Sequence, residues 1–173
     1  MTDSKNLAAL LAATKVLVVD DEHYMRKVVR TLLMSIGVRT IYEAPDGPAG
    51  LEAIRSMSPD VVIVDWQMPG LDGASFVRMV RSPETFPYPN VPIIMLTGHG
   101  ERSRVIEAIQ IGVNEFLLKP VSSKALHSRM VSVLTKPRAI VKSGAYYGPV
   151  PRNLVVALNE DADDAMTTLV LVN

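Results

Sequence analysis

Short apolar runs recur along the chain up to position 136, and amphipathic segments separate them. Most of these runs hold three or four apolar residues with no polar interruption, which is typical of parallel strands buried on both faces. The segments between them repeat apolar positions with a period near 3.6, which predicts helices. The pattern therefore predicts an α/β protein with strands at 16–19, 61–64, 93–96 and 116–118 and a weaker strand at 40–43. Helices are expected at about 25–36, 48–57, 74–81, 102–111 and 122–135.

The alternation of strand and helix divides the chain into three parts. Residues 15–136 form the α/β domain. Residues 1–14 are rich in Ala and Leu, so we expect a short N-terminal helix or arm. A signal sequence is rejected for this stretch, because Asp3 lies where a signal would be basic. Residues 137–173 are expected to be a C-terminal extension, partly extended or disordered.

Two adjacent tyrosines, Tyr146 and Tyr147, lie within the Gly- and Pro-rich part of this extension. Such a pair is expected to need a surface to pack on. Two surfaces are open to it: the α/β domain of the same chain, or a second subunit in a homodimer. We favour packing of residues 138–152 on the chain's own domain.

Composition narrows the classes of function. The 173 residues include 18 basic and 18 acidic side chains, and this balance offers no general attraction to nucleic acid or to an anionic membrane. No apolar run approaches the length of a bilayer span, so we expect a cytoplasmic protein without a membrane partner. The chain contains no Cys, which excludes disulfides, thiolate metal sites and cysteine nucleophiles. The extension is too short for a DNA-binding output domain, so direct binding to nucleic acid is not expected.

Polar side chains follow four of the predicted strands. Asp20 and Asp21 come after the first strand, Asp65 after the third, Thr97 after the fourth and Lys119 after the fifth. A lone Asp at such a place is usually a helix cap. However, ligands of open α/β sheets bind at the carboxyl ends of the strands, and four matching strand ends together indicate a site there.

The chemistry of these residues points to a phosphoryl group and a metal ion. Three clustered carboxylates repel one another, and oxygen ligands at a few positions suit Mg²⁺, which keeps several waters. A divalent cation, a lysine and a hydroxyl can together stabilise the charge of a transferring phosphoryl group. Because Asp carboxylates can form aspartyl phosphates, Asp65, alone on the central strand, is the candidate acceptor. Asp20 and Asp21 then hold the metal.

The segments VLVVDDE, VDWQMPGLDG, MLTG and FLLKP carry these residues, and together they resemble the motifs of response-regulator receiver domains of the CheY-like kind. The resemblance covers residues 15–136. It implies a flavodoxin-like five-stranded parallel sheet in the order 2-1-3-4-5 with helices on both faces. It also implies that Asp65 takes a phosphoryl group from a phosphohistidine of a sensor histidine kinase or a histidine phosphotransfer protein. The change would then be passed to a downstream protein target.

For the metal, the resemblance implies that Asp21 binds Mg²⁺ directly and Asp20 largely through water. Asp65 would be a further ligand, and Gln67 would contribute its backbone carbonyl. His99 is expected in a surface loop rather than as a phosphocarrier, because no second His or Cys accompanies it in the sequence.

For the switch, the resemblance implies that Lys119 contacts the phosphoryl oxygens and that Thr97 moves to hydrogen-bond the phosphoryl group. Phe116 would then move inward into the space that is vacated. The resemblance further implies a cis peptide bond between Lys119 and Pro120.

Two other functions compete with a signalling switch, which is not an ordinary turnover enzyme. The first is a Mg²⁺-dependent phosphatase of the haloacid-dehalogenase type, but that class wants Asp-x-Asp after the first strand, whereas Asp20 and Asp21 are adjacent. The second is an adaptor that is no longer phosphorylated, which the complete set of acceptor-site residues disfavours. Arg26, Lys27 and Arg30 are a solvated helix face or a docking face for an acidic partner.

Overall fold

Strands and helices alternate from residue 15 to residue 135 in a computed structural model, which describes residues 2–98, 102–151, 153–156 and 169–172. The helices are α1 (Thr2–Ala13), α2 (His23–Ser35), α3 (Gly47–Met57), α4 (Gly73–Val80), α5 (Arg102–Gln110) and α6 (Ser123–Thr135). The strands are β1 (Lys15–Val19), β2 (Thr40–Ala44), β3 (Val61–Asp65), β4 (Ile93–Thr97), β5 (Glu115–Leu118), β6 (Ile140–Ser143), β7 (Tyr146–Pro149), β8 (Asn153–Val156) and β9 (Leu169–Val172). None of the described helices is long and apolar enough to cross a membrane.

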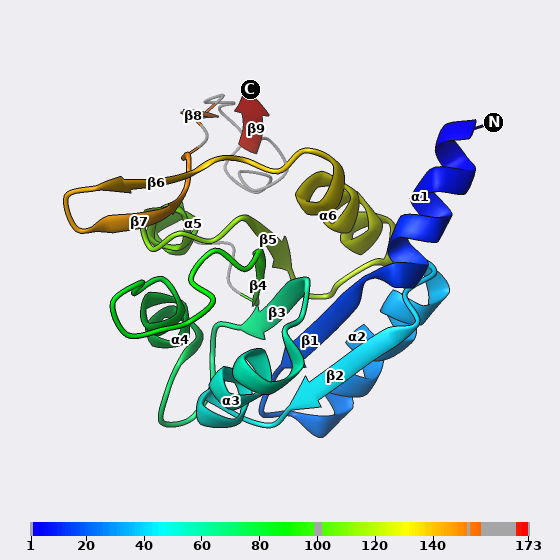
Figure 1. The fold of residues 1–173 in the computed structure, drawn as a ribbon, viewed down its shortest axis with the longest axis horizontal. Coiled ribbons are helices and arrows are strands. Elements are labelled where there is room, and N and C mark those ends of the chain that lie inside the picture. The colour runs from blue at the N-terminus through cyan, green and yellow to red at the C-terminus, as the bar shows by residue number, and fades with distance from the viewer. Residues whose placement is uncertain (1, 99–101, 152, 157–168, 173) are drawn as a thin grey trace.

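The first five strands form one parallel sheet in the order β2-β1-β3-β4-β5 (Figure 1). This order confirms the expected flavodoxin-like topology. The order places β1, β3, β4 and β5 side by side, and each of these strands ends at the same edge. That edge is where the polar residues singled out above are found.

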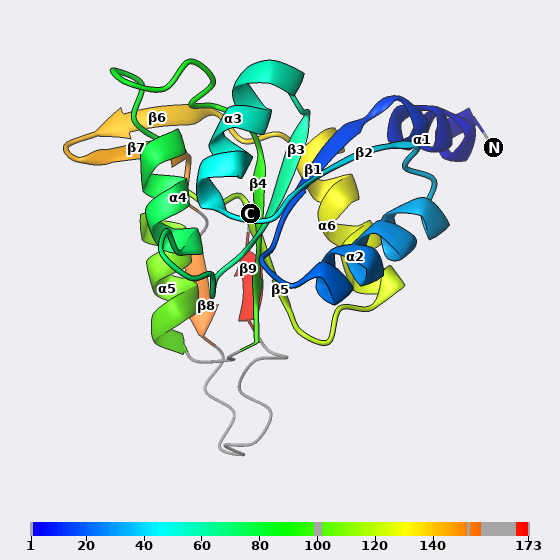
Figure 2. The ribbon, with the colours of Figure 1, turned by 90° about the horizontal axis from the view of Figure 1, so that it is seen from below.

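Helices cover both faces of the sheet, with α3, α4 and α5 on one side and α2 and α6 on the other (Figure 2). Successive residues of β1 point to opposite cores: Leu17 and Val19 pack with the first group of helices, and Val16 and Val18 with the second. All four side chains are fully buried. A strand that must fill two cores has no polar position, which explains its uninterrupted apolar run.

The weaker strand signal at 40–43 has a structural cause, because β2 lies at an edge of the sheet. Glu43 is exposed there and forms ion pairs with Arg26 at 3.5 Å and Arg30 at 3.4 Å. Arg26 and Arg30, two of the three basic residues on this face of α2, therefore pair with an acid of the same chain. The third, Lys27, is exposed.

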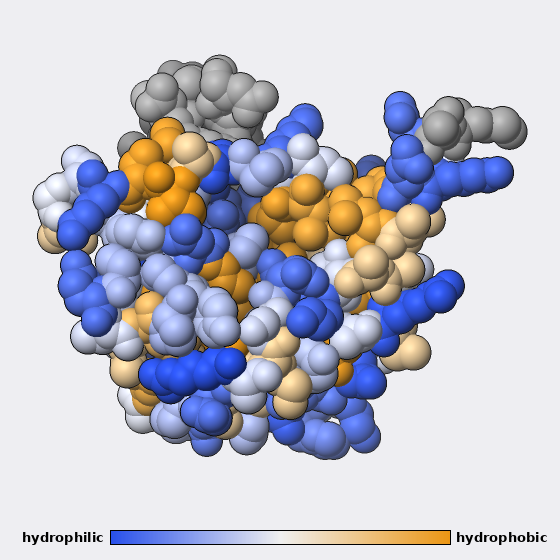
Figure 3. All heavy atoms as spheres, viewed as in Figure 1, coloured by the Kyte–Doolittle hydropathy of each residue, from blue (hydrophilic) through white to orange (hydrophobic). Residues whose placement is uncertain are grey.

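The N-terminal segment is a helix. Leu11 of α1 is buried in the same core as α2 and α6, and Leu7 packs against that core in part. Leu10 remains 39% exposed. Figure 3 shows apolar side chains gathered over α6 and the end of α1, with polar side chains around them. The helix thus adds side chains to one core of the domain and leaves part of its own apolar surface exposed.

The helix that follows β2 begins one residue earlier than the sequence predicts. Asp46 is its cap, and its Oδ1 accepts a hydrogen bond of 2.8 Å from the amide of Ala49. Gly47 is then the first helical residue and Pro48 the second. Proline is tolerated at both positions, because neither amide has a partner within the helix.

Residues 140–149 of the C-terminal extension fold back on themselves, within the segment that the sequence predicts to be partly extended or disordered. β6 and β7 form an antiparallel hairpin whose turn contains Gly144 at a φ of 59°. Lys142 pairs with Glu84 at 3.2 Å, and the hydroxyl of Tyr147 donates to Oδ1 of Asn90. These contacts confirm that the arm packs on the chain's own domain. β8 and β9 form a second antiparallel pair.

A buried arginine at the end of α4 fixes the surface on which the hairpin lies. The guanidinium of Arg81 donates to the carbonyls of Gly112, Pro89 and Val91 at 2.9, 2.7 and 2.7 Å, and to Oδ1 of Asn114 at 2.8 Å. Burial lowers the pKa of Arg81 to about 10, so the side chain stays charged at neutral pH. One side chain therefore ties the loop before β4 to the turn before β5.

The turn at Gly112 shows how closely the hairpin approaches. A Cβ atom at Gly112, whose φ is 97°, would lie 2.8 Å from the carbonyl oxygen of Tyr147. Only glycine fits this left-handed position under a crossing backbone.

Candidate functional site

The carboxyl ends of the adjacent strands bring three carboxylates together. Asp65 is the last residue of β3, and Asp20 and Asp21 follow β1. One oxygen from each of the three lies within 4.8 Å of the others. Asp20 and Asp65 are buried and Asp21 is exposed, so the cluster has a closed side and an open side.

A lysine from the far side of β4 reaches this cluster. The Nζ of Lys119 lies 2.9 Å from Oδ1 of Asp65 and 3.9 Å from Oδ2 of Asp20. Its backbone amide donates to the carbonyl of Thr97 at 2.9 Å, which fixes the loop after β5 to the end of β4. The peptide bond between Lys119 and Pro120 is cis.

The electrostatics of the cluster are unfavourable without a further cation. Burial raises the pKa of Asp20 to about 6, against the lowering effect of the Glu22 amide, and the charge of Asp65 adds to the rise. Burial also raises the pKa of Asp65, while its hydrogen bond to Lys119 opposes this. One lysine does not balance three acids.

An unused oxygen makes the cluster suitable for a metal ion. Oδ2 of Asp20 is buried, and no hydrogen bond to it exists within the described part of the chain. Buried acceptors of this kind call for a ligand. Beside the cluster lies an open cavity of about 520 Å³, which Asp21 and Gln67 line. Few oxygen ligands beside open space for water fit the coordination habit of Mg²⁺.

Thr97 and Phe116 lie on the neighbouring strands β4 and β5. Thr97 ends β4, is 3% exposed and pairs in register with Leu118 of β5. Phe116 pairs with Met95 and is half-buried. The guanidinium of Arg129 lies 5.9 Å from the centre of the Phe116 ring. Thr97 and Phe116 are thus linked through the backbone pairing of β4 with β5, in which Phe116 lies two residues before the partner of Thr97.

The family model described as "Response regulator receiver domain" matches residues 16–131. The chain belongs to the response-regulator receiver family. The chemotaxis protein CheY of Pseudomonas aeruginosa is 34% identical over 122 residues, which are 70% of this chain and 97% of that protein. CheY1 of Helicobacter pylori (strain 26695) is 36% identical over 121 residues, 69% of this chain and 96% of that protein.

Solved receiver structures agree with these matches. The receiver domain of the Francisella response regulator 1452 has a TM-score of 0.65 at 30% identity, over 72% of this chain and 99% of that one. CheY4 of Vibrio cholerae has a TM-score of 0.63 at 32% identity, over 70% and 98%. The haloacid-dehalogenase alternative gains no support from these comparisons.

Two residues of the receiver's site escaped the sequence analysis. Gly73 begins α4 so close to β3 that a Cβ atom there would lie 2.3 Å from the carbonyl oxygen of Asp65. Its place in the VDWQMPGLDG segment is the only signal that could have shown this. Arg104 of α5 lies over the ring of Trp66, 5.7 Å from its centre, and a lone arginine on a helix gives no signal. His99 lies outside the described residues.

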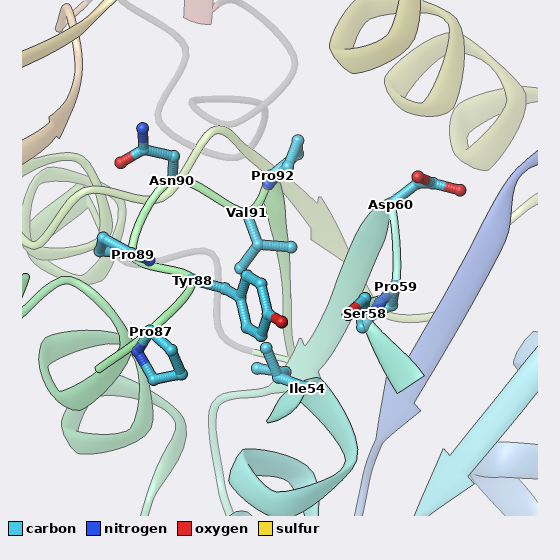
Figure 4. Close-up of a pocket in the computed structure, with 10 residues that line it drawn as sticks. All are labelled: Ile54, Ser58, Pro59, Asp60, Pro87, Tyr88, Pro89, Asn90, Val91 and Pro92. Atoms are coloured by element: carbon cyan, nitrogen blue, oxygen red, sulfur yellow. The ribbon is translucent and has the colours of Figure 1, made fainter. Parts of the chain in front are cut away.

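A second pocket lies at the opposite edge of the receiver's sheet. It has a volume of about 390 Å³ between the end of α3 and the loop before β4. Figure 4 shows the ring of Tyr88 reaching from that loop toward Ile54 and Ser58. The acidic residue that lines this pocket, Asp60, accepts a hydrogen bond of 2.8 Å from the amide of Lys15. Prolines make up much of the remaining wall, and their side chains carry no polar or charged group. The candidate functional site is therefore the cluster at the opposite edge of the sheet.

The raised pKa of Asp20 predicts how the metal-free receiver responds to pH. Because the folded pKa of about 6 exceeds the ordinary 3.8, the folded state binds a proton more tightly than the unfolded chain. Stability therefore falls as pH rises from about 4 to about 6. Asp20→Asn cannot ionise, so we expect it to lose part of this slope and to melt several degrees above wild type at neutral pH.

Thermal unfolding in EDTA across this pH range measures the slope. Asp46→Asn is the control, because Asn caps a helix as well as Asp does. Equal slopes in wild type and Asp20→Asn would contradict the prediction.

Proposed function

We propose that this receiver is a phosphorylation switch in which Asp65 is the phosphoacceptor. The observation that carries the proposal is the position of Lys119 Nζ, 2.9 Å from Oδ1 of Asp65 within a cluster of three carboxylates. The donor is a phosphohistidine of a sensor histidine kinase or of a histidine phosphotransfer protein.

In the transfer step, a carboxylate oxygen of Asp65 bonds to phosphorus while the phosphorus–nitrogen bond of the phosphohistidine breaks. The imidazole leaves with the electron pair of that bond and takes up a proton. Lys119 pairs with Asp65 before the transfer and with the phosphoryl oxygens after it. Its positive charge therefore has a negative partner throughout. Later attack by water on phosphorus returns Asp65 as a carboxylate and releases inorganic phosphate.

Asp20, Asp21, Asp65 and the backbone carbonyl of Gln67 would hold Mg²⁺. The ion supplies positive charge that offsets the negative charge of the transferring group. The clustering of the three carboxylates supports this assignment, and a bound cation would favour the ionised forms of Asp20 and Asp65 against the burial that raises the pKa of each.

The output runs through Thr97 and Phe116. A ligand shifts a two-state equilibrium only if it binds one state better than the other. The hydroxyl of Thr97 at the end of β4 provides that difference by bonding to the phosphoryl group. Phe116 then moves inward and changes the surface that a downstream protein binds.

Incubation of the full chain with acetyl phosphate and Mg²⁺ tests the proposal by intact mass. We expect the mass of one phosphoryl group to be added, and EDTA to prevent it. Hydroxylamine, which cleaves acyl phosphates, should remove the group, and peptide mapping should place it on Asp65. A stable adduct that forms equally well in EDTA would contradict an aspartyl phosphate made with Mg²⁺.

A further inference from the structure

Arg104 holds a positive charge beside the acceptor site. Its guanidinium lies 5.7 Å from the centre of the Trp66 ring, within the range of a cation–π contact. Trp66 directly follows Asp65 and is only 8% exposed, so the ring is a fixed platform next to the acceptor. The contact positions the charge without neutralising it.

Within the described part of the chain, this guanidinium lacks the ion-pair partner that several other arginines have. Nη1 of Arg104 is buried and donates no hydrogen bond to any described residue. No described carboxylate lies within ion-pair distance of Arg104 either. By contrast, Arg78 on the neighbouring helix pairs with Glu107 at 3.2 Å. A buried donor without a partner is costly, and its retention points to a ligand.

The cavity beside Asp21 supplies the place where that ligand binds. Arg104 lines this cavity of about 520 Å³ together with Asp21 and Gln67. Its other charged lining residues, Glu22 and Asp72, are acidic. An anionic phosphodonor that enters here meets these three acidic side chains, and Arg104 is the one cation among the lining residues.

We propose that Arg104 binds an oxygen of the phosphoryl group during its transfer to Asp65. The guanidinium turns from the Trp66 ring toward the phosphate, which gives Nη1 its missing acceptor. Lys119 holds the phosphate from the side of β5, and Arg104 holds it from the side of α5. Charge-assisted hydrogen bonds from arginine to phosphate are among the stronger polar contacts in proteins. The inference rests on the proposed function of Asp65.

The test compares rates of phosphorylation by acetyl phosphate with Mg²⁺ in the full chain. Arg104→Met removes the charge and keeps an apolar stem on Trp66, and Arg104→Lys keeps the charge. We expect the second-order rate constant to fall about tenfold or more in Arg104→Met. Arg104→Lys should retain most of the rate. Arg78→Met, which removes an exposed arginine from α4, is the matched control and should react like wild type.

Melting temperature and Trp66 fluorescence separate this role from a structural one. If Arg104 only fixed the Trp66 loop, Arg104→Met would lower the melting temperature and shift the emission, and its rate would fall no more than its folded fraction. That result, or a wild-type rate in Arg104→Met, overturns the inference while leaving Asp65 as acceptor. If the wild-type chain itself forms no adduct, the proposed function fails and this inference fails with it.

Discussion

Replacing Asp65 by Asn is expected to abolish the phosphate adduct completely. The amide that replaces the carboxylate carries no negative charge and cannot form an acyl phosphate. The substitution is nearly isosteric, and it removes an acid whose pKa is raised mainly by burial, so the variant should fold. Intact mass after treatment with acetyl phosphate and Mg²⁺ measures the result.

Asp72→Asn is the matched control for this experiment. Asp72 lines the same cavity, but its Oδ1 caps α4 by accepting a hydrogen bond of 2.8 Å from the amide of Ser75. Asn caps helices as well as Asp does, so this variant should form the adduct. An adduct that persists undiminished in Asp65→Asn would mean that another residue accepts the phosphoryl group.

Replacing Arg81 by Met is expected to cause the largest loss of stability among the substitutions considered. The change leaves the carbonyls of Pro89, Val91 and Gly112 without the donor that pairs them now. We expect a loss of about 2–4 kcal/mol in the free energy of unfolding, because unpaired buried acceptors cost about 1–3 kcal/mol each and the contributions are not additive. The melting temperature should fall by about 5–15 °C.

Chemical denaturation of Arg81→Met and Arg78→Met, side by side, checks this expectation. Arg78 has the same side chain on the same helix, but it is exposed and makes one ion pair. Exposed ion pairs contribute about 0–1 kcal/mol, so its loss should have little effect. A change below about 1 kcal/mol in Arg81→Met would show that water satisfies the three carbonyls instead.

The sheet and the cluster of carboxylates could be predicted because both depend on a simple rule. Strands with two buried faces leave uninterrupted apolar runs, and parallel strands end at a common edge. Asp20, Asp65, Thr97 and Lys119 each follow such a run, so their positions along the sequence already imply that they meet. The order of the strands came from the family resemblance, since periodicity alone does not fix which strand lies beside which.

The remaining features depend on contacts that no local pattern encodes. Arg81 lies at the end of an amphipathic helix and resembles any surface arginine in sequence, although it is 5% exposed. Arg104 of α5 lies over the ring of Trp66, which comes from the loop after β3, and this contact joins segments far apart in the sequence. The hairpin escaped prediction because β7 contains Gly148 and Pro149, and neither residue is typical of strands.

The candidate site also depends on the folding of the whole domain, because its residues come from strands far apart in the sequence. Asp20 stands near the beginning of the sheet-forming segment and Lys119 near its end, yet the two approach to 3.9 Å only after β1, β3, β4 and β5 have paired. A truncated or half-folded chain that lacks β5 keeps its three acids and has no lysine to oppose them. We expect such a molecule not to accept a phosphoryl group, because the proposed transfer to Asp65 uses the charge of Lys119.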